Sequence, residues 1–325
     1  MTRYFLGVDV GGTKSHALVA DESGHALGLG TGGPGNWEVV GYDGLAATLN
    51  AITDQALSTA AVARSQLAGA GFGVAGYDWP SQAEAHRQAI ATLGLSAPYE
   101  LVNDTTIGLV AGARQGWGVA VVSGTGCNCR GRDPRGQEGR VVGCGEHFGE
   151  FGGASELVGK ALEAVALAWT RRGPTTRLTD AFIRLLGAAD EGDLIEGFSL
   201  WRYQLQPANA PLVFQIAAEG DVVAQELIRW AGRELGSLAI GVIRQLGIEQ
   251  LEFELVLIGS MFKSGPALTE ALAETVHTVA PGAQLLRLTV PPVVGGVLLG
   301  MQHAGLDTAA LRRTLIDSAR ALSQE

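Results

Sequence analysis

Residues 6–15, LGVDVGGTKS, decide the fold that we predict, because they place a glycine-rich turn directly after an apolar run. A second stretch of the same kind lies at residues 121–130, VVSGTGCNCR. Glycine lets backbone N–H groups come close to a phosphate, and a threonine hydroxyl adds another donor. Two such loops in one chain therefore predict a nucleotide that is held from two sides.

The pattern around the first loop is repeated around the second. In the first part of the chain, apolar runs and turn signals predict strands over 3–10, 15–20, 25–30, 68–74 and 99–103. Helices are predicted over 42–63 and, after a capping-box pattern at 81–84, up to about residue 93. In the second part they predict strands over 118–123, 128–133, 140–144, 252–258 and 284–288, with mostly helical sequence over 154–247 and at the end. Each Gly-Thr loop thus opens a meander that continues into α/β elements.

This repeat predicts an α/β fold with two related domains and a cleft between them. We place the domains at residues 1–112 and 113–325, and we expect the last helix to pack back on the first domain. Both glycine-rich loops would then border the cleft.

The composition limits the classes of partner. The chain has 325 residues, a formal net charge of −10 and 46% hydrophobic residues, which is ordinary for a globular protein with a sizeable core. The acidic balance disfavours a nucleic-acid partner or an anionic membrane surface. We find neither an apolar run of about 18 residues nor a signal-peptide layout at the start. With three cysteines, this indicates a cytoplasmic protein whose thiols are reduced.

Four motifs, in their order along the chain, resemble the sugar kinase/actin/heat-shock ATPase superfamily. They most closely resemble its BadF/BadG/BcrA/BcrD-type ATPases and N-acetylglucosamine kinases. The motifs are DVGGTK at 9–14, ND at 103–104, SGTGCNCR at 123–130 with a DPRG turn at 133–136, and LIGS at 257–260. The resemblance covers essentially the whole chain. It implies an actin-like, ribonuclease H-like ATPase fold that binds ATP and Mg²⁺.

The resemblance also implies a set of nucleotide-binding residues, each with a plainer alternative. Asp9 would hold Mg²⁺ through water, because this ion takes oxygen ligands and keeps much of its hydration. The phosphates would lie against Gly11, Gly12, Thr13 and Lys14 and against Gly124, Thr125 and Gly126, and the adenosine against Gly259 and Ser260. Without a nucleotide, Asp9 is a strand-end residue, the two loops are ordinary hairpin turns, and the last pair is a strand-to-helix turn.

Asp104 follows an apolar strand and precedes two threonines that can open a helix. The resemblance implies that Asp104 is the catalytic base, which accepts the proton of the attacking sugar hydroxyl, and that it is a second magnesium ligand. By the local pattern alone, Asp104 is equally well explained as a helix N-cap.

The acceptor sugar is expected to contact Asn36, Asp104, Thr125, Asn128 and Glu150. Asn36 ends the TGGPGN loop, and an amide suits a sugar because it both donates and accepts hydrogen bonds. Glu150 stands where the family has a sugar-binding Asp, but Phe151 replaces the usual Glu and Cys144 the usual Trp. These differences leave the exact sugar open. The alternatives are a surface turn residue for Asn36 and a helix N-terminal acid for Glu150.

The cysteines allow two further hypotheses. Cys127, Cys129, Cys144 and His147 could form a zinc site, although buried, reduced thiols fit the resemblance better. The same cysteines would be needed for the iron–sulfur cluster of an ATPase that activates a 2-hydroxyacyl-CoA dehydratase, as in another branch of the family.

Together these observations predict an ATP-dependent kinase that phosphorylates the 6-hydroxyl of an amino sugar, first N-acetylglucosamine and second glucosamine. Domain closure would exclude water and limit ATP hydrolysis. A sugar sensor on the same fold is a further alternative, which Asp104 and the lack of a preceding helix-turn-helix disfavour. We expect a small-molecule sugar as partner, neither nucleic acid nor membrane, and a homodimer.

Overall fold

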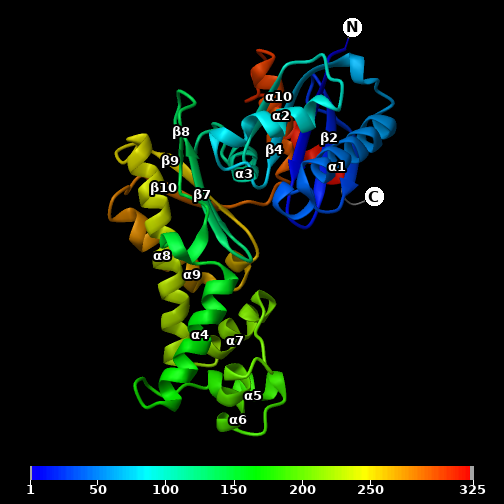
Figure 1. Ribbon diagram of the computed structural model, residues 1–325. Coiled ribbons are helices and arrows are strands. Elements are labelled where there is room, and N and C mark those ends of the chain that lie inside the picture. The colour runs from blue at the N-terminus through cyan, green and yellow to red at the C-terminus, as the bar shows by residue number, and fades with distance from the viewer. Residues whose placement is uncertain (1, 323–325) are drawn as a thin grey trace.

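The computed structural model describes residues 2–322 and contains two five-stranded sheets, one in each half of the chain (Figure 1). The first sheet consists of β1 (Tyr4–Val10), β2 (Ser15–Asp21), β3 (Ala26–Gly32), β4 (Leu67–Val74) and β5 (Tyr99–Val102). The second consists of β6 (Gly118–Ser123), β7 (Cys127–Arg132), β8 (Glu138–Arg140), β9 (Phe253–Ile258) and β10 (Ala283–Arg287).

The strand order is the same in both sheets. The first runs β3-β2-β1-β4-β5 and the second β8-β7-β6-β9-β10. In each, the first three strands form an antiparallel meander, and the other two lie parallel to the central strand. A meander needs only short turns, whereas parallel strands need crossovers, which helices supply. The predicted repeat of two α/β halves is confirmed, and each half has its Gly-Thr loop between its first two strands.

Helices connect and cover the sheets. In the first half they are α1 (Trp37–Ala60), α2 (Ala83–Ala91) and α3 (Asp104–Gly112). In the second half they are α4 (Ala154–Trp169), α5 (Leu178–Leu186), α6 (Glu191–Ser199), α7 (Ala210–Ala218), α8 (Val222–Leu246), α9 (Pro266–His277), α10 (Val293–His303) and α11 (Arg312–Leu322). None of the helices between residues 2 and 322 is long and apolar enough to cross a membrane.

Helices from both ends of the chain cover the first sheet. Strand side chains alternate between the two faces, so Val8 of β1 packs on the side of α1, whereas Phe5 packs with Val294 of α10. The approach of α10 depends on a glycine in β1. A β-carbon on Gly7 would lie 2.4 Å from the backbone nitrogen of Val297. The end of the chain, including α11 against β3, thus completes the first half.

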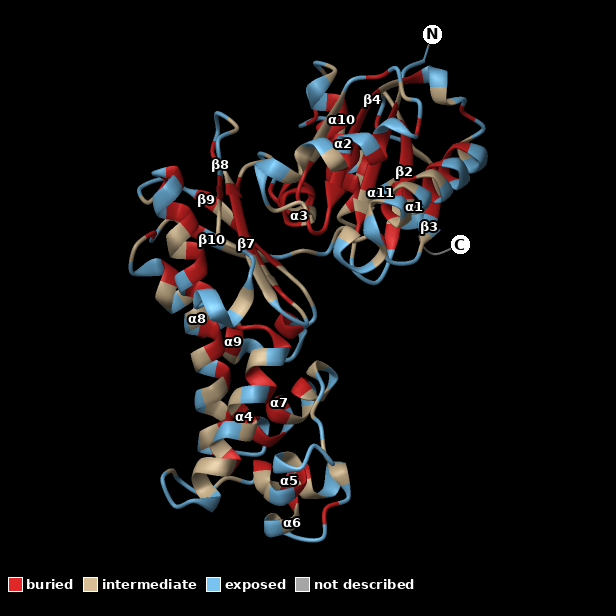
Figure 2. Ribbon diagram, in the orientation of Figure 1, coloured by how far each residue is buried: buried red, intermediate tan, exposed pale blue. Residues whose placement is uncertain are grey.

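The helix α3 belongs to the first half of the chain but packs on the sheet of the second half. Its Leu109 packs in one small core with Ala120 of β6 and Val256 of β9, so a helix of the first half covers the second sheet. Figure 2 shows α3 as a mostly buried helix where the two halves meet. Each sheet is therefore covered in part by a helix from the other half.

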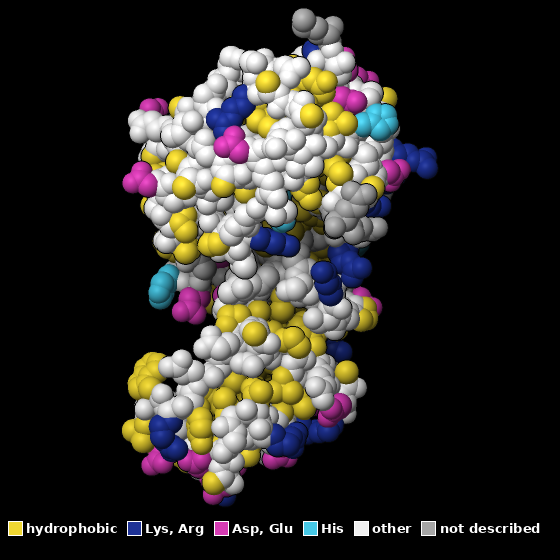
Figure 3. Space-filling view, turned by 90° about the vertical axis from the view of Figure 1, so that its right-hand side faces the viewer, with side chains coloured by type: hydrophobic (Ala, Val, Ile, Leu, Met, Phe, Trp, Pro, Cys, Tyr) yellow, Lys and Arg dark blue, Asp and Glu magenta, His cyan; other side chains and the backbone are white. Residues whose placement is uncertain are grey.

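Helices α4 to α7, with the first turns of α8, extend the second half away from both sheets (Figure 1). Leu157 of α4 and Phe182 of α5 belong to the same buried core as Val121 of β6, so this extension is continuous with the second half. Large apolar side chains are nevertheless exposed on it, namely Trp169, Leu185, Leu200 and Trp201. Figure 3 shows hydrophobic side chains gathered on this part of the molecule.

Two helix predictions are wrong in detail. The first helix begins at Trp37, one turn earlier than predicted. It is interrupted at Gly41, whose φ is 70°, and its continuous part follows from residue 42, as predicted. The capping box predicted at 81–84 does not form, because α2 begins at Ala83 after a short 3-10 turn. There the side chain of Gln82 accepts the N–H groups of residues 78 and 79, both at 2.8 Å.

Candidate active site

The first glycine-rich loop joins β1 to β2 and is held by backbone hydrogen bonds. Gly11 N–H donates to the carbonyl of Lys14 at 3.1 Å, and Gly35 N–H donates to the carbonyl of Gly11 at 3.0 Å. Gly12, Thr13 and Lys14 are exposed. A β-carbon on Gly12 would have no heavy atom within 4 Å, so no packing within the protein requires glycine there. The loop leaves room for a ligand at Gly12.

The second glycine-rich loop joins β6 to β7 and lies against the start of α4. Ala154 N–H donates to the carbonyl of Gly124, and Ser155 N–H donates to that of Thr125, both at 2.9 Å. β-Carbons on Gly124 and Gly126 would also have no heavy atom within 4 Å. The positive end of the α4 dipole is beside this loop, which favours an anion there.

Gly259 and Ser260, directly after β9, lie against the base of the second loop. Gly259 has a φ of 117°, and a β-carbon on it would lie 2.1 Å from the carbonyl oxygen of Ser123. Ser260 is exposed. The turns after β6 and β9 therefore form one surface at the carboxyl ends of parallel strands, where α/β sheets bind their ligands.

A cavity near this turn was not predicted from the sequence. It has a volume of about 300 Å³ and lies between α7, α8 and the start of α9. Its lining includes Phe214, Ala217, Gln225, Ile228, Ser264 and Gly265. These residues come from two helices and from the turn before α9, so no local pattern could reveal them. Arg229 of α8 also lines the cavity, and a mostly apolar slot with a few polar groups suits a flat aromatic ring.

Asp104 is the first residue of α3, and Asn103 is its N-cap, since Asn103 Oδ1 accepts the Thr105 N–H at 3.0 Å. The N-cap alternative for Asp104 is therefore wrong, although its Oδ1 also accepts this N–H at 2.8 Å. Burial and the negative charge of Asp9 raise the pKa of Asp104 to about 7, while the Thr105 N–H and the charge of Arg130 act against this shift. A carboxyl group with such a pKa can accept a proton near neutral pH.

Asp9 is the next-to-last residue of β1 and is paired in register with His16 of β2 and Gly73 of β4. Its Oδ2 lies 3.9 Å from Nδ1 of His16. Because the charge of Asp9 acts on Asp104, the two carboxylates border the same space. Among residues 2–322, no group of three or more His, Cys, Asp or Glu side chains could hold a metal ion. Two carboxylates fit Mg²⁺, which usually keeps several waters and takes phosphate oxygens as its other ligands.

An ion pair that the sequence analysis missed joins the two halves beside Asp104. Asp78, in the loop after β4, accepts a hydrogen bond from Nη2 of Arg130 in β7 at 2.6 Å. The same Oδ1 of Asp78 accepts from Nδ2 of Asn103 at 3.2 Å. Arg130 stands in a motif quoted above but had no predicted role, and Asp78 has no local signal because its partner is in the other half.

Asn36 and Asn128 are each held by nearby backbone. Asn36 is the N-cap of α1 and accepts the N–H two residues ahead at 3.0 Å. Asn128 Oδ1 accepts the N–H of Cys129 at 2.8 Å. A β-carbon on Gly76 would lie 2.4 Å from Oδ1 of Asn36, so the loop that carries Asp78 passes beside Asn36.

Glu150 is buried, and backbone donors already engage both of its carboxylate oxygens. These donors are the N–H groups of Val142, Gly143, Cys144 and Gly145, at 2.6 to 3.1 Å. The predicted strand over 140–144 is therefore wrong. The Glu150 carboxylate collects N–H groups that would otherwise extend β8, which ends at Arg140. Glu150 orders this loop.

The model of the BadF/BadG/BcrA/BcrD ATPase family matches residues 6–300. This chain belongs to the BadF/BadG/BcrA/BcrD ATPase family. The family predicted from the motifs is thus confirmed, and the match covers both glycine-rich loops, Asp104 and the turn at Gly259.

Known relatives of this BadF-type chain are similar over almost their whole length. It is 29% identical to N-acetyl-D-glucosamine kinase of Dictyostelium discoideum, with 91% of this chain and 97% of that protein covered. It is 23% identical to N-acetylmuramic acid/N-acetylglucosamine kinase of Clostridium acetobutylicum, with coverages of 91% and 98%. A solved ROK family glucokinase from Streptomyces griseus, in complex with glucose and AMPPNP, has a TM-score of 0.55 at 19% identity, with coverages of 93% and 100%. That likeness confirms the predicted two-part fold.

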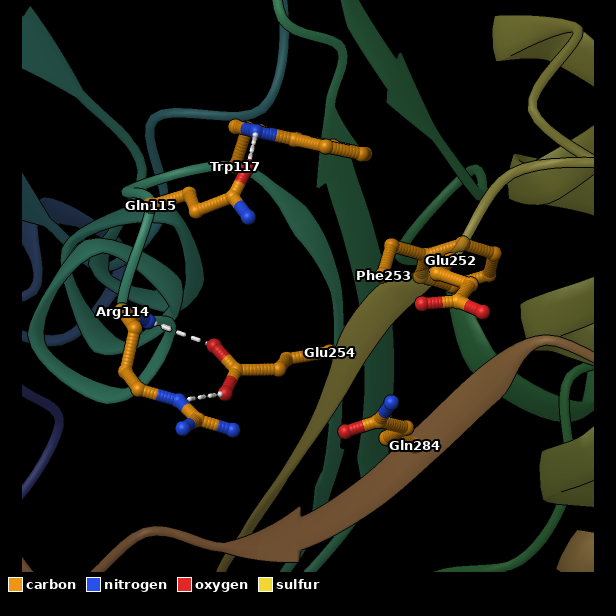
Figure 4. Close-up of a pocket in the computed structure, with 7 residues that line it drawn as sticks. All are labelled: Arg114, Gln115, Trp117, Glu252, Phe253, Glu254 and Gln284. Atoms are coloured by element: carbon orange, nitrogen blue, oxygen red, sulfur yellow. Dashed lines mark hydrogen bonds and ion pairs between the residues drawn. The ribbon is translucent and has the colours of Figure 1, made fainter.

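A further cavity of the BadF-type chain lies at the other end of the second sheet (Figure 4). It has a volume of about 310 Å³. Arg114 and Glu254 line it and form an ion pair, with Nε and Oε1 2.6 Å apart, and Trp117 donates to Gln115 at 2.8 Å. These residues precede β6 or begin β9, so the cavity is at the amino ends of strands whose carboxyl ends carry the loops. It is separate from the candidate active site.

The cysteines of the BadF-type chain do not form the zinc site considered above. Cys129 is buried and Cys144 is exposed. Burial raises the pKa of Cys127 to about 12 and also raises that of Cys129. Both thiols therefore stay protonated near neutral pH in the metal-free protein. Since the described part of the chain has no metal-binding group that includes them, the zinc hypothesis is wrong.

Proposed function

We propose that this BadF-type protein is an ATP-dependent sugar kinase that phosphorylates the 6-hydroxyl of N-acetylglucosamine. The observation that carries the proposal is the position of Asp104, whose pKa is near neutrality and which shares its surroundings with Asp9. The similarity to kinases of N-acetylglucosamine and N-acetylmuramic acid supports a sugar as the substrate class.

In this proposal, ATP binds with its phosphates between the loops Gly11–Lys14 and Gly124–Gly126. The open space around three of their glycines supports this placement, and so does the start of α4 beside the second loop. The adenosine lies against Gly259 and Ser260, and the apolar cavity beside Ser264 suits the adenine ring.

Asp104 has two proposed roles. It accepts the proton of the sugar 6-hydroxyl, and together with Asp9 it would hold Mg²⁺. The bound ion would neutralise charge on the phosphate oxygens. Phosphoryl transfer depends on positioning and charge stabilisation more than on a strong base, so a carboxylate suffices.

The proposed sugar site draws on both halves of the chain: Asn36 and Asp104 from the first, and Thr125, Asn128 and Glu150 from the second. The amide of Asn36 donates one N–H to Glu38 Oε2 at 3.1 Å and keeps its second N–H for a sugar hydroxyl, and the amide of Asn128 also has N–H donors for the sugar. Glu150 contributes by ordering residues 142–145. A β-carbon on Gly143 would lie 3.5 Å from Oδ1 of Asp78, so this loop meets the first half near Asp104.

Two alternatives concern the substrate and the reaction. Glucosamine has the same 6-hydroxyl and could use the same groups. An activator of a 2-hydroxyacyl-CoA dehydratase would need cysteines that hold a cluster, but Cys129 lies in the core of the second half and Cys127 packs against it. No observation on the described residues favours the activator.

The test is a coupled assay of ADP release with Mg·ATP. The panel contains N-acetylglucosamine, glucosamine, N-acetylmuramic acid, N-acetylmannosamine, glucose and a blank without sugar. We expect turnover with N-acetylglucosamine well above the blank, and the product should be the 6-phosphate by NMR. Hydrolysis that is independent of every sugar would overturn the proposal.

A further inference from the structure

The strand β7 presents a charged face to the first half of the chain. Asn128, Arg130 and Arg132 are two residues apart and therefore share one face, while the alternate residues Cys127 and Cys129 face the core of the second half. Two ion pairs cross from this face to the first half. Arg130 reaches Asp78 at 2.6 Å, and Arg132 reaches Glu100 at 2.8 Å.

The two arginines differ in how deeply their side chains are buried. The side chain of Arg130 is 6% exposed and that of Arg132 is 21% exposed. Arg130 Nη2 is bonded to Asp78, but its buried Nε–H has no hydrogen-bond partner among residues 2–322. Buried polar groups almost always have a partner, so an unpaired guanidinium donor beside a candidate active site indicates a missing ligand oxygen.

Asp78 connects Arg130 to the start of α3. Its Oδ1 also accepts from Nδ2 of Asn103, and Asn103 in turn caps the helix that begins with Asp104. Arg130 is also close enough for its charge to act on Asp104. A short chain of hydrogen bonds therefore runs from β7, through Asp78 and Asn103, to the backbone that carries Asp104.

We propose that Arg130 binds the acceptor sugar and positions Asp104. Its Nε–H donates to an oxygen of the sugar, while Nη2 holds Asp78 and, through it, the first turn of α3. This inference rests on the proposed function, because it assigns a ligand to the same site. It makes sugar binding and the placement of the base depend on one guanidinium group that belongs to the opposite half.

The test compares Arg130→Lys with Arg132→Lys. Lysine keeps the positive charge that pairs with the carboxylate but lacks the fork of N–H donors. Both variants alter an ion pair between the halves on the same face of β7. Because Arg130 is the more buried of the two, a purely structural role predicts a larger loss of stability for Arg130→Lys, but no selective rise in its sugar KM. We expect Arg130→Lys to raise the sugar KM about tenfold or more and to lower kcat, with the ATP KM unchanged. Arg132→Lys should stay within about threefold of the wild type in each constant.

Asp78→Asn gives a second, independent readout. It keeps the shape of the side chain but weakens the hold on Arg130 and Asn103. We expect kcat to fall more than sugar affinity, because the sugar contact of Arg130 remains while Asp104 is less well placed. Thermal unfolding of all three variants separates loss of function from loss of fold. Equal kinetic effects of Arg130→Lys and Arg132→Lys, or an effect on the ATP KM alone, would overturn the inference.

Calorimetry without nucleotide separates this inference from the proposed function. If the wild type binds a sugar of the panel but phosphorylates none, the proposed function fails. The inference then stands if Arg130→Lys weakens that binding about tenfold and Arg132→Lys does not. If the wild type binds no sugar, both fail.

Discussion

Gly259 is so close to Ser123 that a β-carbon on it would lie 2.1 Å from the carbonyl oxygen of Ser123. The turn after β9 and the strand that leads into the second glycine-rich loop are thus in direct backbone contact. Any side chain at residue 259 has to push the two strands apart. The parts of the site proposed for adenosine and for phosphate therefore depend on one close contact.

Gly259→Ala is expected to weaken both the fold and nucleotide binding. The added methyl group meets backbone, and the φ of 117° is unfavourable for any residue with a side chain. We expect a loss of stability of about 1–3 kcal/mol or more. Urea unfolding measures the stability, and calorimetry with ATP measures the binding. Ser260→Ala is the control, since Ser260 is exposed and its removal should leave stability unchanged.

Gly12→Ala and Gly124→Ala are expected to weaken ATP binding without weakening the fold. The space around both positions is open, so the added methyl group meets no protein atom, and Tm should stay within a few degrees of the wild type. If phosphates approach these glycines, the KM for ATP should rise about tenfold or more. Gly33→Ala, which also meets nothing within 4 Å, is the matched control. An ATP KM equal to that of the control would count against the proposed phosphate site.

Asp104→Asn should lower kcat at least about a hundredfold, as expected for the loss of a general base. The same change should stabilise the protein without nucleotide or Mg²⁺. The pKa of Asp104 is raised from 3.8 to about 7, so between these values the folded protein holds a proton that the unfolded chain has lost. Stability from this group therefore falls as pH rises through that window.

The uncharged amide avoids this loss of stability. The free energy of unfolding of Asp104→Asn should therefore exceed that of the wild type by on the order of 2–4 kcal/mol at pH 8, and by much less below pH 4. Urea unfolding across this range checks the expectation. The exposed Asp43→Asn is the control and should follow the wild-type curve. A variant that is less stable than the wild type at pH 8 would contradict the inference that the folded protein disfavours the ionised form of Asp104.

Glu150→Gln tests the loop over 142–145. The amide replaces one acceptor oxygen by a donor that faces backbone N–H groups, which leaves one or two of these N–H groups unpaired. We expect a loss of about 1–3 kcal/mol in stability and a higher sugar KM, with the ATP KM unchanged. The exposed neighbour Glu146→Gln serves as the comparison. If the two variants bind sugar equally well, Glu150 does not shape the acceptor site.

Local signals predicted much of this architecture. The two glycine-rich loops, Asp9 and the strand before Asp104 were found because a turn after an apolar run depends on neighbours in sequence. The first turn of α1 was missed because Trp37, whose indole N–H donates to the Gly76 carbonyl at 2.8 Å, adds one turn before Gly41. A contact of this kind produces no periodic pattern in the sequence.

The long-range contacts that hold the candidate site together could not be predicted from the sequence. Arg130 and Asp78 are 52 positions apart in different halves, so neither predicts the other. Glu150 was read as a free ligand because nothing in the pattern shows that four backbone N–H groups turn toward it. Long-range pairing and the saturation of a buried charge are properties of the packed chain.

The exchange of α3 and α10 between the halves means that neither is an autonomous folding unit. A fragment that ends at residue 112 would lack α10 and leave Phe5 and the apolar face of the first sheet in water, while α3 would have lost β6 and β9. The complementary fragment would carry α10 with no sheet to cover. Expressed apart, the two pieces should be insoluble, and only their co-expression should restore a folded complex.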